Sequence, residues 1–142
     1  MTRSAPRTQP CDTAQARTRL EHAGKFLEVA ELVAGESGDV EYASAAAALA
    51  VLAGIAASDA ACCTALGRRA RGQDHRQATE LVEQVMPGGK QASGLLRRLL
   101  SLKDEAHYGL FDIGGADLRA ALRQARGLVK FANQVMRLRA HV

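Results

Sequence analysis

The sequence predicts an all-α protein, an antiparallel bundle of four long helices with one additional short helix. Alanine and leucine dominate the chain, aromatic residues make up only 4% of it and tryptophan is absent, a balance that favours helices over strands. Apolar residues recur at three- and four-residue intervals in long segments, and short loops without a strand pattern join these segments. The 142 residues therefore fit one helical domain.

The first helix is expected to begin at Asp12 and to end before residues 35–39. The stretch DTAQ places an N-cap carboxylate three residues before Gln15, which is the capping-box arrangement. One apolar stripe follows at helical spacing. It consists of Leu20, Ala23, Leu27, Ala30 and Ala34, with Phe26 and Val33 beside it.

The second helix is expected to run from Val40 or Glu41 to Leu66 and is apolar on nearly every side. A helix of this kind is usually buried by several neighbours or shared with another subunit. Its most apolar run, residues 43–58, is shorter than the roughly 20 residues that a bilayer requires. We therefore expect a buried central helix and no membrane partner.

Of the remaining helices, the third is expected to be short, and the fourth and fifth are expected to be long. Asp74 and Gln77 repeat the capping-box pattern and open the short third helix, which PGG at 87–89 closes. The fourth helix is rich in leucine and ends near Gly109, and the fifth begins near Ala116. Together these elements predict a disordered arm over residues 1–11, a bundle over 12–138 and a frayed tail over 139–142.

The charge and the cysteines bear on partners and compartment. The net charge is +4 and much of the excess is arginine, so an acidic partner such as a nucleic acid or a phosphorylated ligand is expected. Cys62 and Cys63 are adjacent and Cys11 falls in the expected arm, so the three match no metal spacing and no disulfide framework. These features predict a cytoplasmic protein with no metal and no cofactor.

A basic cluster lies in the stretch GRRARGQDHR. Backbone N–H groups at a helix N-terminus attract anions, and nearby guanidinium groups strengthen that attraction, so a phosphate or nucleic-acid contact is one interpretation. A solvated basic loop is the other. The residues concerned are Arg68, Arg69, Arg71, His75 and Arg76.

The stretch LKDEAHYG holds the candidate catalytic residues. Lys103 and His107 are four residues apart and share a helix face, with Asp104 and Tyr108 beside them. Here His107 would exchange a proton near neutral pH, Lys103 would stabilise phosphate charge and Tyr108 would hold substrate. The alternative is a solvated face with His107 and Tyr108 capping the helix end.

Asp59 interrupts the apolar central helix. An unpaired buried carboxylate would cost several kcal/mol, so Asp59 must reach water or meet a cation. Lys103, Arg69 and Arg97 are the candidate partners. We regard Asp59 and Asp104 as supporting residues.

The order of these features resembles the HEPN family of small helical bundles over residues 12–138. The similarity lies in a small-residue helix ending SDAACCTALG, a short helix opening DHRQATELV, and the segment LLRRLLSLKDEAHYG. Family members with ribonuclease activity carry an arginine followed by a histidine and act across a dimer cleft. In this sequence Lys103 stands where that arginine is expected.

The resemblance implies a homodimer, which the large apolar surface of the second and fourth helices also favours. The first functional expectation is a binding module that engages a nucleotidyltransferase-like protein, a nucleotide or RNA through its basic surface. The alternative is a metal-independent ribonuclease of a bacterial toxin–antitoxin or defence system that uses His107 and Lys103.

Overall fold

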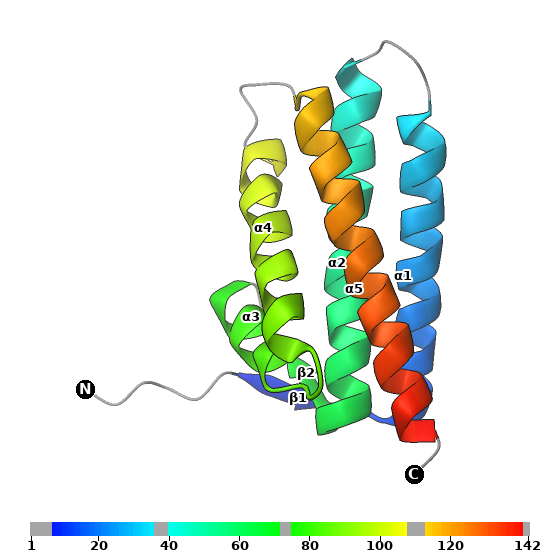
Figure 1. Ribbon diagram of the computed structural model, residues 1–142, viewed down its shortest axis with the longest axis vertical. Coiled ribbons are helices and arrows are strands. Elements are labelled where there is room, and N and C mark those ends of the chain that lie inside the picture. Colours follow the sequence, from blue (N-terminus) through cyan, green and yellow to red (C-terminus); the bar gives the residue numbers. More distant parts are fainter. Residues whose placement is uncertain (1–6, 36–39, 72–74, 108–112, 141–142) are drawn as a thin grey trace, which may run out of the picture.

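The computed structural model describes residues 7–35, 40–71, 75–107 and 113–140, and its architecture is a helical bundle (Figure 1). The prediction of an all-α protein with four long helices and one short helix is confirmed for these residues. Two strands of three residues each accompany the helices. The elements in chain order are β1 (Thr8–Pro10), α1 (Thr13–Ala34), α2 (Val40–Leu66), β2 (Arg68–Ala70), α3 (His75–Glu83), α4 (Gly89–His107) and α5 (Gly115–Ala140).

The helix ends follow local sequence signals closely. Asp12 caps α1, because its Oδ1 accepts the backbone N–H of Gln15 at 2.7 Å, while the Gln15 Oε1 accepts the backbone N–H of Asp12 at 2.9 Å. Helix α2 ends at Leu66, and the next residue is Gly67, whose φ of 71° suits a residue without a Cβ atom. The prediction of a frayed tail is wrong for residues 139 and 140, because they belong to α5. Residues 141 and 142 lie outside the described residues.

Alanines form the contact between α1 and α2. Ala16, Ala23 and Ala30 lie seven residues apart on α1, and each is 0% exposed. Ala23 and Ala30 belong to the same core cluster as an alanine-rich face of α2, so the two helices approach closely with little side-chain volume between them. The larger apolar residues of the predicted stripe, such as Leu20 and Leu27, lie partly buried at the edges of this contact.

Helix α2 is the central helix, as the sequence predicts. It contacts α1, α5 and α4, and Figure 1 shows α5 passing across it. Residues 42–66 are long and apolar enough to cross a membrane by length and composition, yet 72% of that apolar window is buried inside the bundle. Core helices of bundles share this property, so the segment is weak evidence for a membrane span.

The strands change the expected picture of the N-terminus. Thr8–Pro10 pairs antiparallel with Arg68–Ala70, with Gln9 opposite Arg69. The expectation of a disordered arm over residues 1–11 is therefore wrong for residues 8–10. The reason is that the chain leaving α2 at Gly67 presents unpaired backbone groups, which β1 satisfies.

Candidate functional site

The candidate site lies at the end of the bundle that carries β1 and β2. Beyond the ladder itself, the backbone N–H of Cys11 donates to the carbonyl of Gly67 at 3.0 Å, and the N–H of Arg71 donates to the carbonyl of Arg7 at 2.9 Å. The segment that enters α1 is thereby held against the segment that leaves α2. Residues far apart in the sequence meet at this point.

A disulfide between Cys11 and Cys63 fixes this meeting point. The two Cα atoms are 5.4 Å apart and the residues are separated by 52 positions in the chain. A cross-link over a loop of this length stabilises a fold by about 4 kcal/mol in the chain-entropy model. The prediction that the cysteines form no disulfide is wrong, because a strand, and not a disordered arm, carries Cys11 to α2.

The neighbouring cysteine plays no part in this cross-link. Successive residues of a helix point about 100° apart, so Cys63 faces the N-terminal segment while Cys62 faces the core. Cys62 is a free thiol, and burial, reinforced by the charge of Asp59, raises its pKa to about 12.

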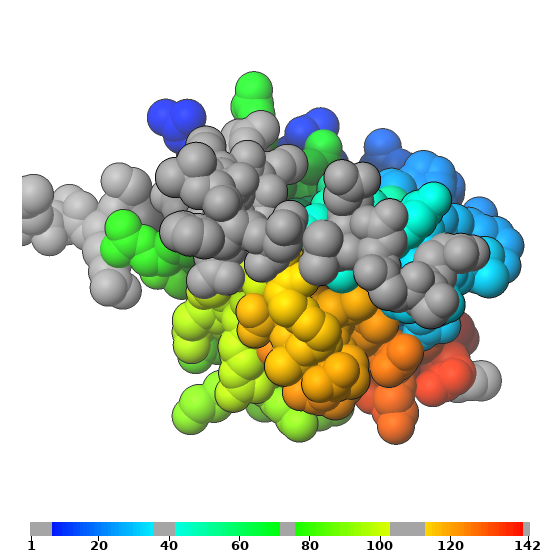
Figure 2. Space-filling model, turned by 90° about the horizontal axis from the view of Figure 1, so that it is seen from above, coloured from blue at the N-terminus to red at the C-terminus, as the bar shows by residue number. Residues whose placement is uncertain are grey.

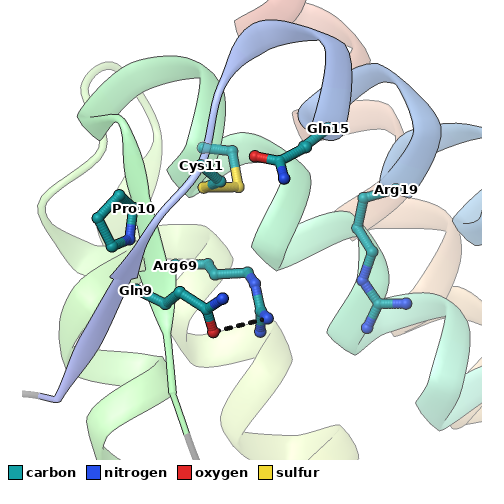
Figure 3. Close-up of a pocket in the computed structure, with 7 residues that line it drawn as sticks. Gln9, Pro10, Cys11, Gln15, Arg19 and Arg69 are labelled. Carbon is teal, nitrogen blue, oxygen red and sulfur yellow. Dashed lines mark hydrogen bonds between the residues drawn. A yellow bond between two sulfur atoms is a disulfide. The ribbon is translucent and has the colours of Figure 1, made fainter.

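An open cavity of about 370 Å³ lies beside the disulfide. Figure 3 shows that its polar side chains come from both strands and from α1, with the disulfide forming part of its wall. The lining residues are Gln9, Pro10, Cys11, Gln15, Arg19, Cys63 and Arg69.

Two guanidinium groups give the cavity its charge. Arg69 of β2 uses one Nη2–H to donate to the Gln9 Oε1 at 3.0 Å, which ties it to the paired strand. Arg19 of α1 donates from Nε and Nη2 to the Asp59 Oδ2 at 3.2 and 3.1 Å. In Figure 3 both guanidinium groups lie on the same side of the disulfide, with Gln15 near it. Each guanidinium retains N–H groups beyond these bonds, since arginine carries five.

Asp59 of α2 is the acidic residue next to the site and forms an ion pair with Arg19. Its burial raises its pKa, and the charges of Arg19 and Arg69 oppose that rise. Of the predicted candidate partners, Arg69 acts on Asp59 through its charge, Arg97 forms no ion pair with it, and the side chain of Lys103 lies outside the described residues. Arg19 is the ion-pair partner, because α1 and α2 pack side by side and bring residue 19 opposite residue 59.

The predicted basic cluster gathers at this end of the bundle but contributes one cavity residue. Arg69 lines the cavity, whereas the Arg68 Nη2 donates to the Gln84 Oε1 at 3.2 Å and Arg71 is exposed. Arg76 is exposed in the first turn of α3. His75 begins α3, and its side chain lies outside the described residues.

Of the residues that line the cavity, only Arg69 was predicted as a site residue. The others are Gln9, Pro10, Cys11, Gln15, Arg19 and Cys63. Gln15 and Arg19 are four residues apart and so share a face of α1, beginning at the capping box. That spacing was the available signal. The spacing alone does not show that this face of α1 lines a cavity, because other parts of the cavity wall come from the two strands and the disulfide.

The predicted catalytic stretch lies at the other end of the bundle. The backbone of Lys103, Asp104 and His107 is helical and forms the last turns of α4, while their side chains lie outside the described residues. Tyr108 is also outside them. Figure 1 places the end of α4 opposite the strands, and Figure 2 looks onto that end, with the first turn of α5 at its centre. The two predicted sites therefore do not combine into one.

A second hollow runs along the C-terminal half of α5. It consists of two adjoining depressions of about 400 and 380 Å³ that share Pro87, Phe131 and Gln134. Phe131 and Leu138 make its floor mainly apolar, and Lys130 and Arg137 line its sides. This groove suits apolar contacts, whereas the cavity beside the disulfide suits an anion.

Comparisons with known proteins leave the assignment to the chemistry of the site. The sequence matches no protein-family model, and no curated protein matches it at a significant level. Among the described residues, no group of three or more His, Cys, Asp and Glu side chains is placed to hold a metal ion.

Proposed function

We propose that this protein is a binding module that takes a small phosphate-bearing ligand in the cavity beside the disulfide. One observation carries the proposal: Arg19 and Arg69, from α1 and β2, line the same cavity. Arginine presents a planar fork of N–H donors that matches phosphate geometry. Two forks on one cavity make an anion the natural ligand.

The charge balance of the cavity supports this proposal. Asp59 offsets the charge of Arg19, while the Arg69 guanidinium is bonded to the neutral amide of Gln9. The cavity therefore keeps a net positive charge. Its volume of about 370 Å³ falls within the range of small-molecule sites, about 300–1,000 Å³.

Other arginines at the same end of the bundle support the approach of an anion. Arg7, Arg68 and Arg71 lie on or directly beside the two paired strands. Clustered charge of one sign raises the local concentration of an oppositely charged ligand and speeds its association. This effect weakens with salt, so binding is expected to fall as ionic strength rises.

Calorimetric titration with inorganic pyrophosphate and with ADP tests the proposal. Arg69→Ala is expected to weaken binding about tenfold or more, because a hydrogen bond to a charged group contributes about 1.5–3 kcal/mol. Arg123→Ala is the matched control, since Arg123 is exposed on the half of α5 far from the strands. Affinity that is unchanged in Arg69→Ala would contradict the proposal.

The panel of ligands separates the sources of the phosphate. Equal affinity for pyrophosphate and ADP would mean that the cavity recognises the phosphates alone. Tighter binding of ADP would add contacts to the nucleoside. A protein that binds a short single-stranded RNA but neither pyrophosphate nor ADP would have a nucleic-acid-binding surface in place of a small-ligand site. That result would overturn the proposal.

The HEPN resemblance remains part of the proposal at the level of family and partners. It is supported by the order of the helices, in which a long small-residue helix precedes a short helix and a leucine-rich one. We propose on the same basis a homodimer with a nucleotidyltransferase-like partner, and we keep the cytoplasm as the proposed compartment. Partly exposed apolar residues on the described helices, including Leu52 at 44% exposed, favour self-association. Light scattering coupled to size exclusion tests the dimer.

A metal-independent ribonuclease of a toxin–antitoxin system is the second candidate. The observation that favours it is that α4 continues as a helix through His107, so Lys103 and His107 are four residues apart on one helix. RNA cleavage by the protein and by His107→Ala, from about pH 5 to pH 9 around an imidazole pKa of about 6.5, tests this candidate. Cleavage equal in both proteins, or absent from both, excludes His107 as the catalytic group for the RNA used.

A further inference from the structure

We infer that the Cys11–Cys63 disulfide is a redox switch for the phosphate-binding cavity, so that reduction releases β1 and dismantles the site. This inference rests on the proposed function, because it concerns the regulation of the same cavity. It follows from three features, namely which residues form the cavity wall, how β1 is otherwise held, and how the disulfide meets solvent.

The cavity depends on the N-terminal segment for much of its wall. Gln9, Pro10 and Cys11 line it, and all three precede α1. Gln9 also accepts the hydrogen bond that holds the Arg69 guanidinium, at 3.0 Å. Displacement of this segment would remove one wall and free Arg69 from its position.

Apart from the disulfide, β1 is attached weakly. It has three residues and a single neighbour, β2, and Pro10 has no N–H to donate. Its flanks add the bonds Cys11 N–H to Gly67, Arg71 N–H to Arg7, and Arg7 N–H to the Gln77 Oε1 at 3.1 Å. An isolated two-stranded ladder is at best marginally stable in water. The covalent bond therefore dominates the attachment of this segment.

Release of β1 would leave the bundle in place. Helix α1 starts with its own capping box, in which Asp12 and Gln15 satisfy each other's backbone N–H groups. Its alanine contact with α2 involves Ala23 and Ala30, which lie C-terminal to Cys11 and away from β1. The switch would thus act locally, on the cavity and not on the core.

The disulfide is placed for exchange with a small anionic thiol such as glutathione. Both cysteines line the open cavity, and the half-buried Cys11 is more exposed than Cys63, which is 5% exposed. Arg19 and Arg69 would attract the carboxylates of the incoming thiol. Disulfides of cytosolic proteins, where they persist, commonly serve redox sensing or catalysis.

The exchange follows two balanced steps. The thiolate of the incoming molecule attacks the Cys11 Sγ, the Cys11–Cys63 bond breaks, and the Cys63 sulfur leaves as a thiolate that takes a proton from water. A second thiolate then attacks the mixed disulfide, which releases Cys11 and the oxidised disulfide of the small thiol. Two thiols supply the two electrons that reduce the protein.

Pyrophosphate titration of the oxidised protein, the glutathione-reduced protein and Cys11→Ser tests the inference. Alkylation after denaturation verifies the redox state, because one of the three cysteines is free when oxidised and all three when reduced. Reduction and Cys11→Ser are each expected to weaken binding about tenfold or more, as expected for loss of the ordered arginine donors. Reoxidation should restore it. Cys62→Ala is the control that keeps the disulfide and should bind as the unmodified protein does.

Hydrogen exchange without ligand supplies an independent measurement. Reduction is expected to speed exchange of the amides of Cys11 and Arg71, while the amides of α2 and the far-ultraviolet circular dichroism stay unchanged. If oxidised and reduced proteins bind equally and exchange equally, the switch is overturned while the proposed function stands. If the oxidised protein binds no phosphate ligand, the proposed function fails, and the inferred redox regulation of binding fails with it. Loss of helical signal on reduction would also overturn a local switch.

Discussion

Arg19 and Asp59 join α1 to α2 through two hydrogen bonds to a single carboxylate oxygen. The Arg19 Nε and Nη2 lie 3.2 and 3.1 Å from the Asp59 Oδ2, and the side chain of Asp59 is only 13% exposed. Burial raises the pKa of Asp59 despite the opposing charge of Arg19. The free-energy cost of desolvating this carboxylate therefore exceeds the favourable interaction with its cationic neighbours. The ionised pair lowers the stability of the fold, but it holds Arg19 in place beside the cavity.

Asp59→Asn is expected to change the pH dependence of stability. An acid whose pKa is raised by folding binds protons more tightly in the folded state, so its contribution to stability is present at low pH. That contribution is lost as pH rises from the ordinary value of 3.8 through the raised pKa. Urea unfolding at a series of pH values should show Asp59→Asn gaining on the unmodified protein as pH rises. A constant difference would contradict the raised pKa.

Arg19→Ala is expected to destabilise the fold by about 1–2 kcal/mol at neutral pH, because it leaves Asp59 without its hydrogen-bonded cation. The loss is smaller than for a fully buried pair, since the Arg19 side chain is 35% exposed and solvent screens the interaction. Urea unfolding measures the effect. Arg17→Ala, at an exposed position of the same helix, should change stability by less than about 0.5 kcal/mol.

Ala23→Leu is expected to destabilise the bundle by about 1–3 kcal/mol or more, because α1 and α2 leave no volume for a larger side chain between them. Ala14→Leu places the same change at an exposed position of α1 and should be near neutral. Thermal unfolding of the two variants measures the difference. Equal melting temperatures would mean that the alanine contact is not closely packed.

Gly54→Ala is expected to destabilise the core by about 1–3 kcal/mol, because an added Cβ atom would overlap Leu99 and lie 3.1 Å from the Cδ1 of Leu128. Gly24→Ala is the matched control, since nothing lies within 4 Å of the position of its Cβ. There the alanine should stabilise α1 by about 0.5–1 kcal/mol through helix propensity. The two variants should therefore shift the urea midpoint in opposite directions.

The helices were predictable because their signals are local. The capping box of Asp12 and Gln15 fixes one helix start within four residues, and Gly67 ends α2 with a positive φ. The apolar period of α5 extends over many turns, and Leu118, Ala121, Leu122, Ala125 and Leu128, which recur at helical spacing, are all buried. Patterns of this length average out the competing preferences of single residues.

The candidate site was only partly predictable because its contacts are distant in sequence. Strands of three residues are too short for a periodic pattern, so β1 and β2 gave no signal. The pairing of Cys11 with Cys63 depends on that ladder, and the pairing of Arg19 with Asp59 depends on the register of two helices. Arg69 was identified from its basic surroundings alone, without knowledge of which neighbours would complete the cavity.

The raised pKa of Cys62 disfavours attack of its thiol on the Cys11–Cys63 disulfide. Only thiolates attack disulfides, and a thiol with a pKa of about 12 is almost entirely protonated at neutral pH. Although Cys62 adjoins Cys63 in the chain, it is therefore a poor competitor for Cys11 and seldom scrambles the bond. If the Cys11–Cys63 bond opens and closes as we propose, reoxidation is therefore expected to restore the same isomer.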